Sequence, residues 1–204
     1  MLLMDVTVTQ VGKGAKCSVM VFENSDALAM WLAAWGVDMS LWGKDGNKTA
    51  VDLWLELQHG DCILQGPPPL RVVRVVQVVI QQEGKVLIEG AQEMGDGRLR
   101  SRRFFPAEKM KPGEPPAAAA LRCLREELGV ALEQVVILSE GGAQTEKGDS
   151  PSYPGLQTEY HFVEVAARIR GLSDQDFWHE NLAHTLNDPV KRHHWTWVQA
   201  DRNA

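Results

Sequence analysis

The stretch FFPAEKMKPGEPPAAAALRCLREELGV, residues 104–130, decides the fold because it joins a proline-rich loop to a helix that carries paired carboxylates. Pro115 suits the first turn of a helix, where a missing N–H costs nothing. The alanine run that follows has high helix propensity, and Gly129 is a typical helix stop. The sequence therefore predicts a helix that begins near Pro115 and ends at Gly129.

Three side chains of this predicted helix share one face, because Cys123, Glu126 and Glu127 stand at i, i+3 and i+4. Two carboxylates on one helical turn repel each other unless a cation or water lies between them. A hard divalent cation such as Mg²⁺ or Mn²⁺, with a phosphate oxygen completing its shell, suits such a pair. The alternative is a solvated face on which Arg122 pairs with Glu126 at i, i+4.

The same stretch resembles the Nudix box, whose pattern is G-x5-E-x7-R-E-U-x-E-E-x-G-U with U a bulky apolar residue. The matching positions are Glu114, Arg122, Leu124, Glu126, Glu127, Gly129 and Val130. Two positions depart from the pattern: Glu108 replaces the leading glycine, and Cys123 replaces the glutamate after the arginine. Strands are expected before and after the box, so the resemblance covers roughly residues 70 to 200.

The resemblance implies an α/β (α+β) fold class, with a Nudix-type α/β/α sandwich around a mixed β-sheet. It implies hydrolysis of the diphosphate of a nucleoside diphosphate linked to another moiety, with Mg²⁺ or Mn²⁺ as cofactor. In this family the box helix supplies metal carboxylates, here Glu126 and Glu127. The loop glutamate, here Glu114, pairs with Arg122 and fixes the loop on the helix. The expected partner is a nucleotide-like small molecule.

Cys123 bears on whether this chemistry is retained. A neutral thiol is a poor ligand for Mg²⁺, since hard cations prefer oxygen. The substitution predicts weaker metal binding and impaired or absent turnover, unless Glu108 leans into the site and supplies the missing oxygen. The alternative function is a non-catalytic Nudix-fold protein that binds a ligand or serves as a structural subunit of a larger assembly.

A strand expected at about residues 97–105 is rich in arginine. One reading is an edge strand kept soluble by charge. The other is that arginines of this strand, with Arg102 and Arg103 as the candidates, face a diphosphate, which the planar guanidinium suits.

Residues 1–69 are predicted to form a small Trp-rich α/β module ahead of a Nudix domain at residues 70–204. The boundary is placed at GPPPL, residues 66–70, because proline stiffens the chain. Two helices are expected in the module, one capped by Asn24 or Ser25 and one by Thr49. Their tryptophans are expected to form a small core or, alternatively, a docking face for a protein partner at residues 24–57.

The remaining strands follow from alternation and turn signals. Residues 71–90 predict a hairpin that turns at Gly84, and HHWTWVQA, residues 193–200, predicts a final strand. The segments EQVVILSE and YHFVEVAARI are expected as strands separated by a long polar loop at residues 141–157. The carboxylates Asp149, Glu159 and Glu164 are expected mainly as surface charges.

Composition limits the class of partner. The chain has 204 residues and a net charge of −6, so the basic excess that usually accompanies duplex nucleic-acid binding is missing. No apolar run approaches the roughly 20 residues that span a bilayer, so no membrane role is expected. Three cysteines without a paired spacing indicate a reducing compartment, the cytoplasm or an organelle matrix, and not secretion.

Overall fold

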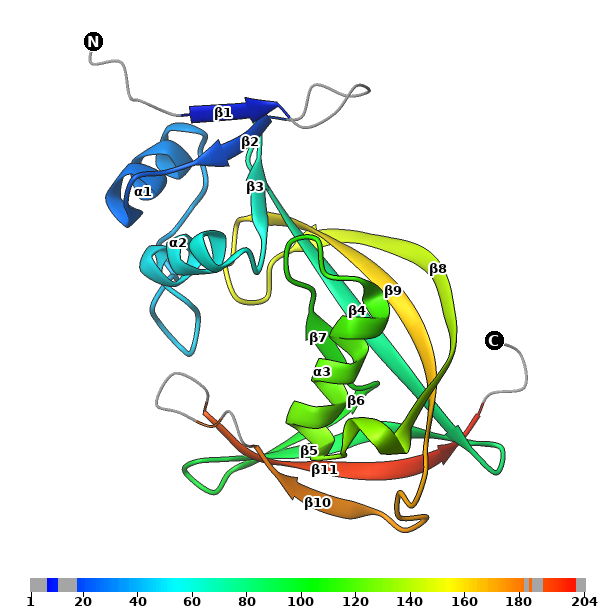
Figure 1. The fold of residues 1–204 in the computed structure, drawn as a ribbon. Coiled ribbons are helices and arrows are strands. Elements are labelled where there is room, and N and C mark those ends of the chain that lie inside the picture. Colours follow the sequence, from blue (N-terminus) through cyan, green and yellow to red (C-terminus); the bar gives the residue numbers. More distant parts are fainter. Residues whose placement is uncertain (1–6, 11–17, 182–183, 185–188, 201–204) are drawn as a thin grey trace. The chain divides into compact units, whose positions relative to one another are not determined.

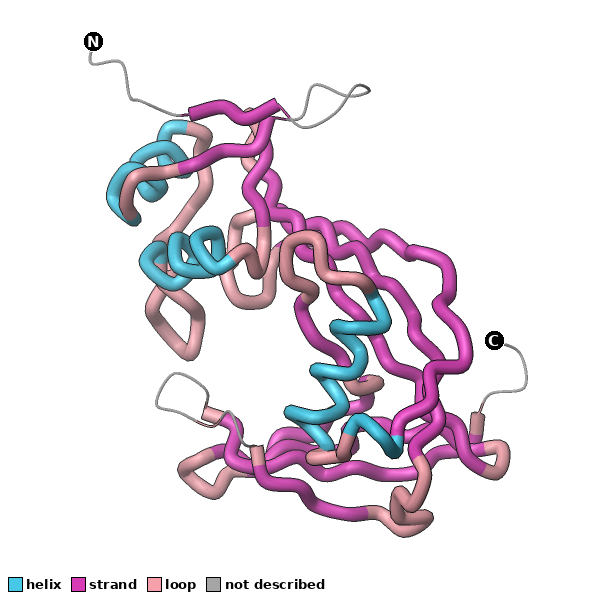
Figure 2. Tube along the Cα trace, in the orientation of Figure 1, coloured by secondary structure: helices cyan, strands magenta, loops and turns pink. Residues whose placement is uncertain are grey.

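The computed structural model describes residues 7–10, 18–181, 184 and 189–200 (Figure 1). The helices are α1 (Ser25–Ala34), α2 (Ala50–His59), α3 (Pro116–Leu128) and the 3-10 segment η1 (Leu132–Gln134). The strands are β1 (Thr7–Gln10), β2 (Ser18–Val21), β3 (Ile63–Gln65), β4 (Leu70–Gln82), β5 (Lys85–Met94), β6 (Leu99–Phe104), β7 (Ala107–Lys109), β8 (Val135–Asp149), β9 (Gln157–Ile169), β10 (Phe177–Glu180) and β11 (Val190–Gln199). Figure 2 shows that strand predominates over helix. The predicted fold class, a Nudix-type α/β fold with a mixed β-sheet, is confirmed.

The chain divides into two compact units. The first comprises Met1–Arg74 and Gln144–His161, and the second comprises Val75–Ala143 and Phe162–Ala204. The strands β4, β8 and β9 contribute residues to both units. The predicted folding domains, residues 1–69 and 70–204, stay a prediction.

In the first unit, β1, β2, β3 and the start of β4 pair as antiparallel neighbours. The two helices have the predicted caps. The Asn24 side chain accepts from the backbone N–H of Ala27 at 2.9 Å. Thr49 and Asp52 form a capping box, and α2 ends at Gly60 in the left-handed conformation. These signals are local in sequence, which explains why they predict the helices well.

The tryptophans of the first unit differ in how deeply they are buried. Trp31 is buried and lies on Phe22 with ring centroids 5.5 Å apart. Trp42 lies on the buried Tyr153 at 5.1 Å. Trp35, which follows the last turn of α1, is instead 50% exposed. The small tryptophan core expected for this module therefore includes Trp31 and leaves Trp35 outside it.

The long polar loop predicted at residues 141–157 is wrong. Strand β8 continues to Asp149 and β9 begins at Gln157, which leaves a short connection at 150–156. Hydrogen bonds at Ser150 close it, with Leu156 O accepting from Ser150 N and Ser150 Oγ from Tyr153 N. The side chains of β8 from residue 139 onward are exposed, so this part of the strand lacks the apolar alternation that predicts strands.

In the second unit, β4 and β5 form the predicted hairpin, with Gln82 opposite Lys85 across Glu83 and Gly84. Beyond the hairpin, β5 pairs with β6 and β11, and β10 lies outside β11. On the other side, β4 pairs with β7 and β9, and β9 pairs with β8. Figure 1 shows α3 beside β7 and above β5 and β11.

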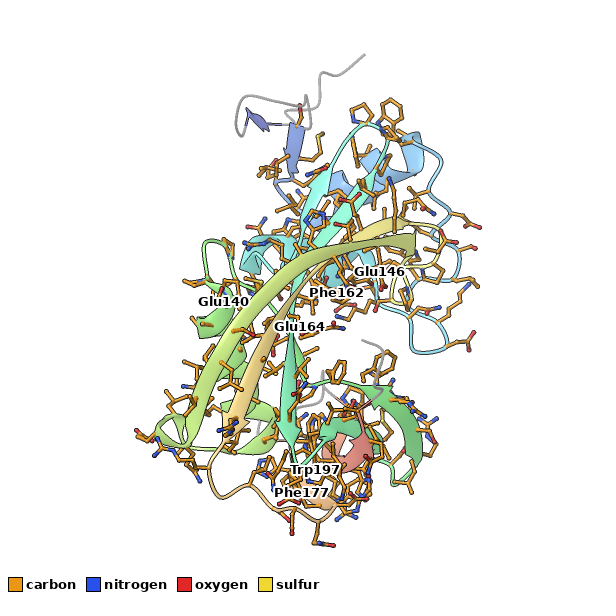
Figure 3. The ribbon with its side chains drawn as sticks, turned by 90° about the vertical axis from the view of Figure 1, so that its right-hand side faces the viewer. Glu140, Glu146, Phe162, Glu164, Phe177 and Trp197 are labelled. Carbon is orange, nitrogen blue, oxygen red and sulfur yellow. The ribbon has the colours of Figure 1, made fainter. Side chains whose placement is uncertain are left out.

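The core of the second unit surrounds α3. Buried side chains of the helix, among them Ala119, Cys123 and Leu124, join a cluster with Val76 of β4 and Trp195 of β11. Phe177 and Trp197, which Figure 3 labels on β10 and β11, pack against this cluster. Helix α3 starts after Pro115 and ends at Gly129, as the sequence predicts.

One strand interrupts the loop expected before the helix. Residues Ala107–Lys109 form β7 and pair with Val75–Gln77 of β4. The segment between Pro106 and Pro112 has no apolar alternation, so its sequence carries no strand signal. The pairing fixes Glu108 on an ordered strand rather than a free loop.

Among the described residues, no helix is long and apolar enough to cross a membrane. The side chains of Cys62 and Cys123 are buried.

Candidate active site

Arg122 and Glu114 form the ion pair that the box resemblance implies. The Nε of Arg122 donates to Glu114 Oε1 at 3.2 Å, and Nη2 donates to Oε2 at 3.1 Å. Glu114 also accepts from the backbone N–H of Lys111 at 2.8 Å. Hydrogen bonds from Arg122 above all lower the pKa of the Glu114 carboxyl, although partial burial opposes this shift. This pair holds the loop before α3 on the helix.

The same guanidinium reaches two more carboxylates. Arg122 Nη1 lies 3.4 Å from Glu108 Oε2 and 3.8 Å from Glu126 Oε2. Its Nη2 also donates to the backbone oxygen of Lys109 at 2.7 Å. Arg122 therefore brings three of the sequence-predicted acids, Glu108, Glu114 and Glu126, around one positive charge.

Cys123 lies inside the core rather than on the open face of α3. Its side chain is fully buried. Burial raises the pKa of the Cys123 thiol well above its usual range, and the charges of Glu127 and Glu108 add to this. The thiol is therefore protonated at neutral pH, and it lies close to the carboxylates that surround the end of the helix.

Among the carboxylates of the box, Glu127 has the most strongly raised pKa. Burial raises the pKa of Glu127 well above its usual range, and the negative charges of Glu89, Glu108 and Glu126 raise it further. A hydrogen bond from Cys123 has the opposite, smaller effect. No basic side chain pairs with Glu127 in the part of the chain that the structure describes. A positive charge placed beside Glu127 would relieve this repulsion.

Glu126 differs from Glu127 because it already has cationic partners. Besides Arg122, Arg125 Nη2 lies 3.3 Å from Glu126 Oε1. The i, i+4 pair of Arg122 and Glu126, which the sequence offers as the alternative to a metal, is therefore present. The box carboxylates are partly neutralised by arginine, and Glu127 is the one that is not.

Glu89 joins this group from β5, and sequence reasoning missed it. Glu89 is 6% exposed, and its Oε1 lies 2.5 Å from His193 Nδ1. Gln92 Nε2 donates to the same oxygen at 2.7 Å, and Arg102 Nε donates to Oε2 at 3.1 Å. Burial opposes ionisation, but hydrogen bonds, led by that from His193, lower the pKa of Glu89. The one sequence signal is a glutamate that directly follows the apolar run VLI of a predicted strand.

The two candidate arginines of β6 lie in different surroundings. Arg102 binds Glu89, and its guanidinium lies over the Phe104 ring at 4.4 Å from the centroid. Arg103 lines a cavity of about 550 Å³ together with Phe104 and Phe105. Gln77 and Gln81 of β4 and Glu164 of β9 supply polar groups to the same cavity. Arg102 therefore links the carboxylates to an aromatic cavity through its two neighbours, Glu89 and Phe104.

The carboxylates near the end of α3 are of a type that binds divalent cations. Carboxylate oxygens are the ligands that Mg²⁺ and Mn²⁺ prefer, and Glu127 is crowded by negative charge without a basic partner among the described residues. In the same described part of the chain, no three His, Cys, Asp or Glu side chains already converge on one point. By residue type alone, these carboxylates could hold a divalent cation.

The other acids that the sequence singles out have different contacts. Asp149, at the end of β8, accepts a hydrogen bond from Gln157. Glu159 lies 2.6 Å from His161 Nε2. These two belong to the first unit, whereas Glu126 and Glu127 belong to the second. Glu164 is exposed, as expected for a surface charge, and it also lines the aromatic cavity.

Comparison with known proteins identifies the region around this site. Residues 70–201 match the family model described as NUDIX domain. No curated protein matches the chain.

Several solved structures are similar to the chain. A NUDIX hydrolase from Nitrosomonas europaea is 20% identical with a TM-score of 0.36, covering 61% of this chain and 71% of that one. An Ap4A hydrolase from C. elegans, in a binary complex, is 15% identical with a TM-score of 0.34, covering 62% and 80%. The dihydroneopterin triphosphate pyrophosphohydrolase of E. coli is 18% identical with a TM-score of 0.35, covering 62% and 80%. Family assignment rests on the match at residues 70–201, because scores this low carry no functional argument.

Proposed function

The chain belongs to the Nudix family, and from this membership we propose that it hydrolyses the diphosphate of a nucleoside diphosphate linked to another moiety, with Mg²⁺ or Mn²⁺ as cofactor. The observation that carries the proposal is the position of Arg102, which contacts the buried acid Glu89 and the cavity residue Phe104. One residue thus contacts both a buried acid and a ring that lines an aromatic cavity suited to a base.

In this proposal Glu126 and Glu127 hold the metal, with Glu108 as a further candidate ligand. The cation, when bound, neutralises the diphosphate and lowers the pKa of water. Glu114 and Arg122 are positioning residues, since they fix the loop on α3 and keep Glu108 and Glu126 within reach of one guanidinium. A positive charge beside Glu127 would offset its acidic neighbours and favour the deprotonated carboxylate.

Substrate recognition is assigned to the cavity. The rings of Phe104 and Phe105 offer faces on which a nucleobase stacks. The amides of Gln77 and Gln81 offer donors and acceptors for its edge. Arg102 and Arg103 are proposed to contact the phosphates, because guanidinium groups bind phosphate oxygens in pairs.

The proposal is tested by assaying the full chain against nucleotide sugars, dinucleotide polyphosphates, NADH, ADP-ribose and oxidised nucleotides with Mg²⁺ or Mn²⁺. We expect turnover of at least one class, and a loss of about 100-fold or more in Glu127→Gln. Glu140→Gln is the matched control, since Glu140 is an exposed acid on β8 (Figure 3). Turnover that survives in Glu127→Gln would rule out the assigned role.

The second candidate is a non-catalytic Nudix-fold protein that binds its ligand or serves as a subunit of an assembly. The observation that favours it is Cys123, whose buried thiol leaves the box without its third carboxylate. A protein partner would be sought on the helices of the first unit, at residues 24–57. Absence of turnover for every substrate, combined with retained nucleotide binding, would favour this candidate over the hydrolase.

A further inference from the structure

Burying the carboxylate of Glu89 costs free energy, so its burial calls for a functional reason. It is 6% exposed, and an ionised carboxylate removed from water is costly unless it is paired and hydrogen-bonded. Three donors satisfy it: His193 Nδ1, Gln92 Nε2 and Arg102 Nε. Of these, Arg102 also lies over the ring of Phe104, and Phe104 lines the aromatic cavity.

The residues that hydrogen-bond to Glu89 are themselves held by further contacts. Gln92, which donates to Glu89, accepts from Arg100 Nε at 3.0 Å through its own oxygen. The ring of His193 stacks on buried Trp195, with 6.0 Å between centroids and 23° between planes. The carboxylate of Glu89 is therefore held from both sides and can fix a mobile side chain in turn.

Arg102 is the side chain that it fixes. Only the Nε of Arg102 is used on Glu89, at 3.1 Å. In the described part of the chain, neither terminal nitrogen of Arg102 donates to an acceptor. The side chain is 31% exposed, and its guanidinium lies 4.4 Å from the centroid of Phe104. The terminal N–H groups of Arg102 therefore remain available for a ligand beside the Phe104 ring.

We propose that Glu89 is a positioning residue that holds the Arg102 guanidinium against Phe104 and so builds a phosphate-binding site beside the aromatic cavity. This inference rests on the proposed function and adds to it the residue that orients the phosphate contact. The ligand group is a phosphate or diphosphate ester, bound by the two terminal nitrogens as a fork. The charge of Glu89 also raises the pKa of Glu127 at the end of α3.

The position of Arg102 over the Phe104 ring limits the class of ligand that this site binds. A guanidinium stacked on a phenylalanine ring offers its edge to anions and leaves the free part of the ring to planar groups. A nucleotide satisfies both contacts, whereas a nucleoside without phosphate satisfies only one. Arg102 is therefore expected to discriminate between these two ligands.

The test measures binding by calorimetry of adenosine 5′-(α,β-methylene)diphosphate, in which a bridging carbon prevents hydrolysis. Arg102→Ala is expected to weaken this ligand by about tenfold or more, and to leave the affinity for adenosine unchanged. Glu89→Gln is expected to weaken the diphosphate by a similar factor. The double variant should bind no more weakly than Arg102→Ala alone, because both changes remove the same contact.

Additive losses in the double variant, or an unchanged affinity in Glu89→Gln, would overturn the positioning role. A wild-type chain that binds the methylene diphosphate no better than adenosine would overturn the phosphate site itself. Arg98→Ala is the matched control, since Arg98 is an exposed arginine near β6 that pairs with Asp96. Its affinity should equal that of the wild type.

Arg102→Lys supplies a second variant in case Glu89→Gln does not fold. Lysine keeps the positive charge but cannot bond Glu89 through one nitrogen and present a pair of others. We expect it to bind the diphosphate about tenfold more weakly, and wild-type affinity in this variant would overturn the proposal. Since no turnover is measured, these outcomes are separate from those of the substrate assay.

Discussion

Arg122 is the residue on which the geometry before and along α3 depends. Its guanidinium contacts Glu114, Glu108 and Glu126 and also the backbone oxygen of Lys109. A single side chain thus ties a loop, a short strand and a helix together. Partial burial, with 20% of the side chain exposed, makes these contacts stronger than those of a surface pair.

Glu114→Gln tests the strength of this tie. We expect the variant to lose about 1–2 kcal/mol of unfolding free energy at about pH 7, because a charge-assisted hydrogen bond is replaced by a neutral one. The measurement is urea denaturation followed by tryptophan fluorescence. Glu133→Gln, at an exposed acid of η1, is the control and should unfold like the wild type.

The pH dependence of this loss has a defined sign. The pKa of Glu114 is lowered in the folded state from its usual value of 4.5. Its contribution to stability is therefore complete above that value and disappears as the pH falls through the folded pKa. The difference between wild type and Glu114→Gln should shrink toward zero at low pH. A difference that stays constant from neutral to acidic pH would contradict the ion pair as its source.

The sequence predicts a site residue where its interaction partner lies nearby in the chain. Glu114 and Arg122 lie 8 positions apart, inside one recognisable pattern. Glu89 and His193 are separated by 104 positions and belong to strands that become neighbours only through the sheet. No local pattern predicts which acid of a strand meets a histidine near the other end of the chain.

At the scale of elements, the end of α3 is fixed by Gly129. This residue adopts φ +65, in the left-handed region, and its backbone N–H bonds to the carbonyl of Arg125. A Cβ placed there would overlap the imidazole ring of His179 on β10. The helix that carries the acids therefore ends in close contact with the strand beside it.

Gly129→Ala is expected to destabilise the protein by about 2–3 kcal/mol, since conformational strain and a steric clash add together. Gly113→Ala is the matched control, because Gly113 has φ +73 and nothing lies within 4 Å of the position that a Cβ would take there. It should cost only about 1 kcal/mol. Urea denaturation of both variants gives the comparison, and equal losses would mean that the His179 contact carries no weight.

Elements were predictable where their own residues mark both ends. The helix α3 has a proline at its start and a glycine at its end, and the sequence predicts both boundaries. Strands β7 and β10 are 3 and 4 residues long, too short for alternation to appear. They depend on partners elsewhere in the chain, which is why tertiary structure decides them.

At the scale of the whole molecule, each functional group is assembled within one compact unit. The box acids, Glu89, Arg102 and the aromatic cavity all belong to the unit formed by Val75–Ala143 and Phe162–Ala204. The segment Gln144–His161, at the tip of the β8 and β9 hairpin, belongs to the other unit. Sequence reasoning predicts two contiguous domains, and a hairpin shared between two units leaves no signal in composition.

The net charge of −6 gives the whole chain a preference for cations over anions. A diphosphate therefore approaches an acidic protein, and a positive charge at the site favours its binding. In the proposed function, arginine supplies part of this charge, at Arg102 and Arg103. The proposed divalent cation supplies the remainder where Glu127 has no basic partner in the described residues.

Titration of Mn²⁺ into the full chain by calorimetry is the most direct test of this central claim. We predict that the wild type and Glu140→Gln bind Mn²⁺ with the same affinity, and that Glu127→Gln binds it about tenfold more weakly or not at all. Equal affinity in Glu127→Gln, or no binding by the wild type, would contradict a metal-dependent site at the end of α3.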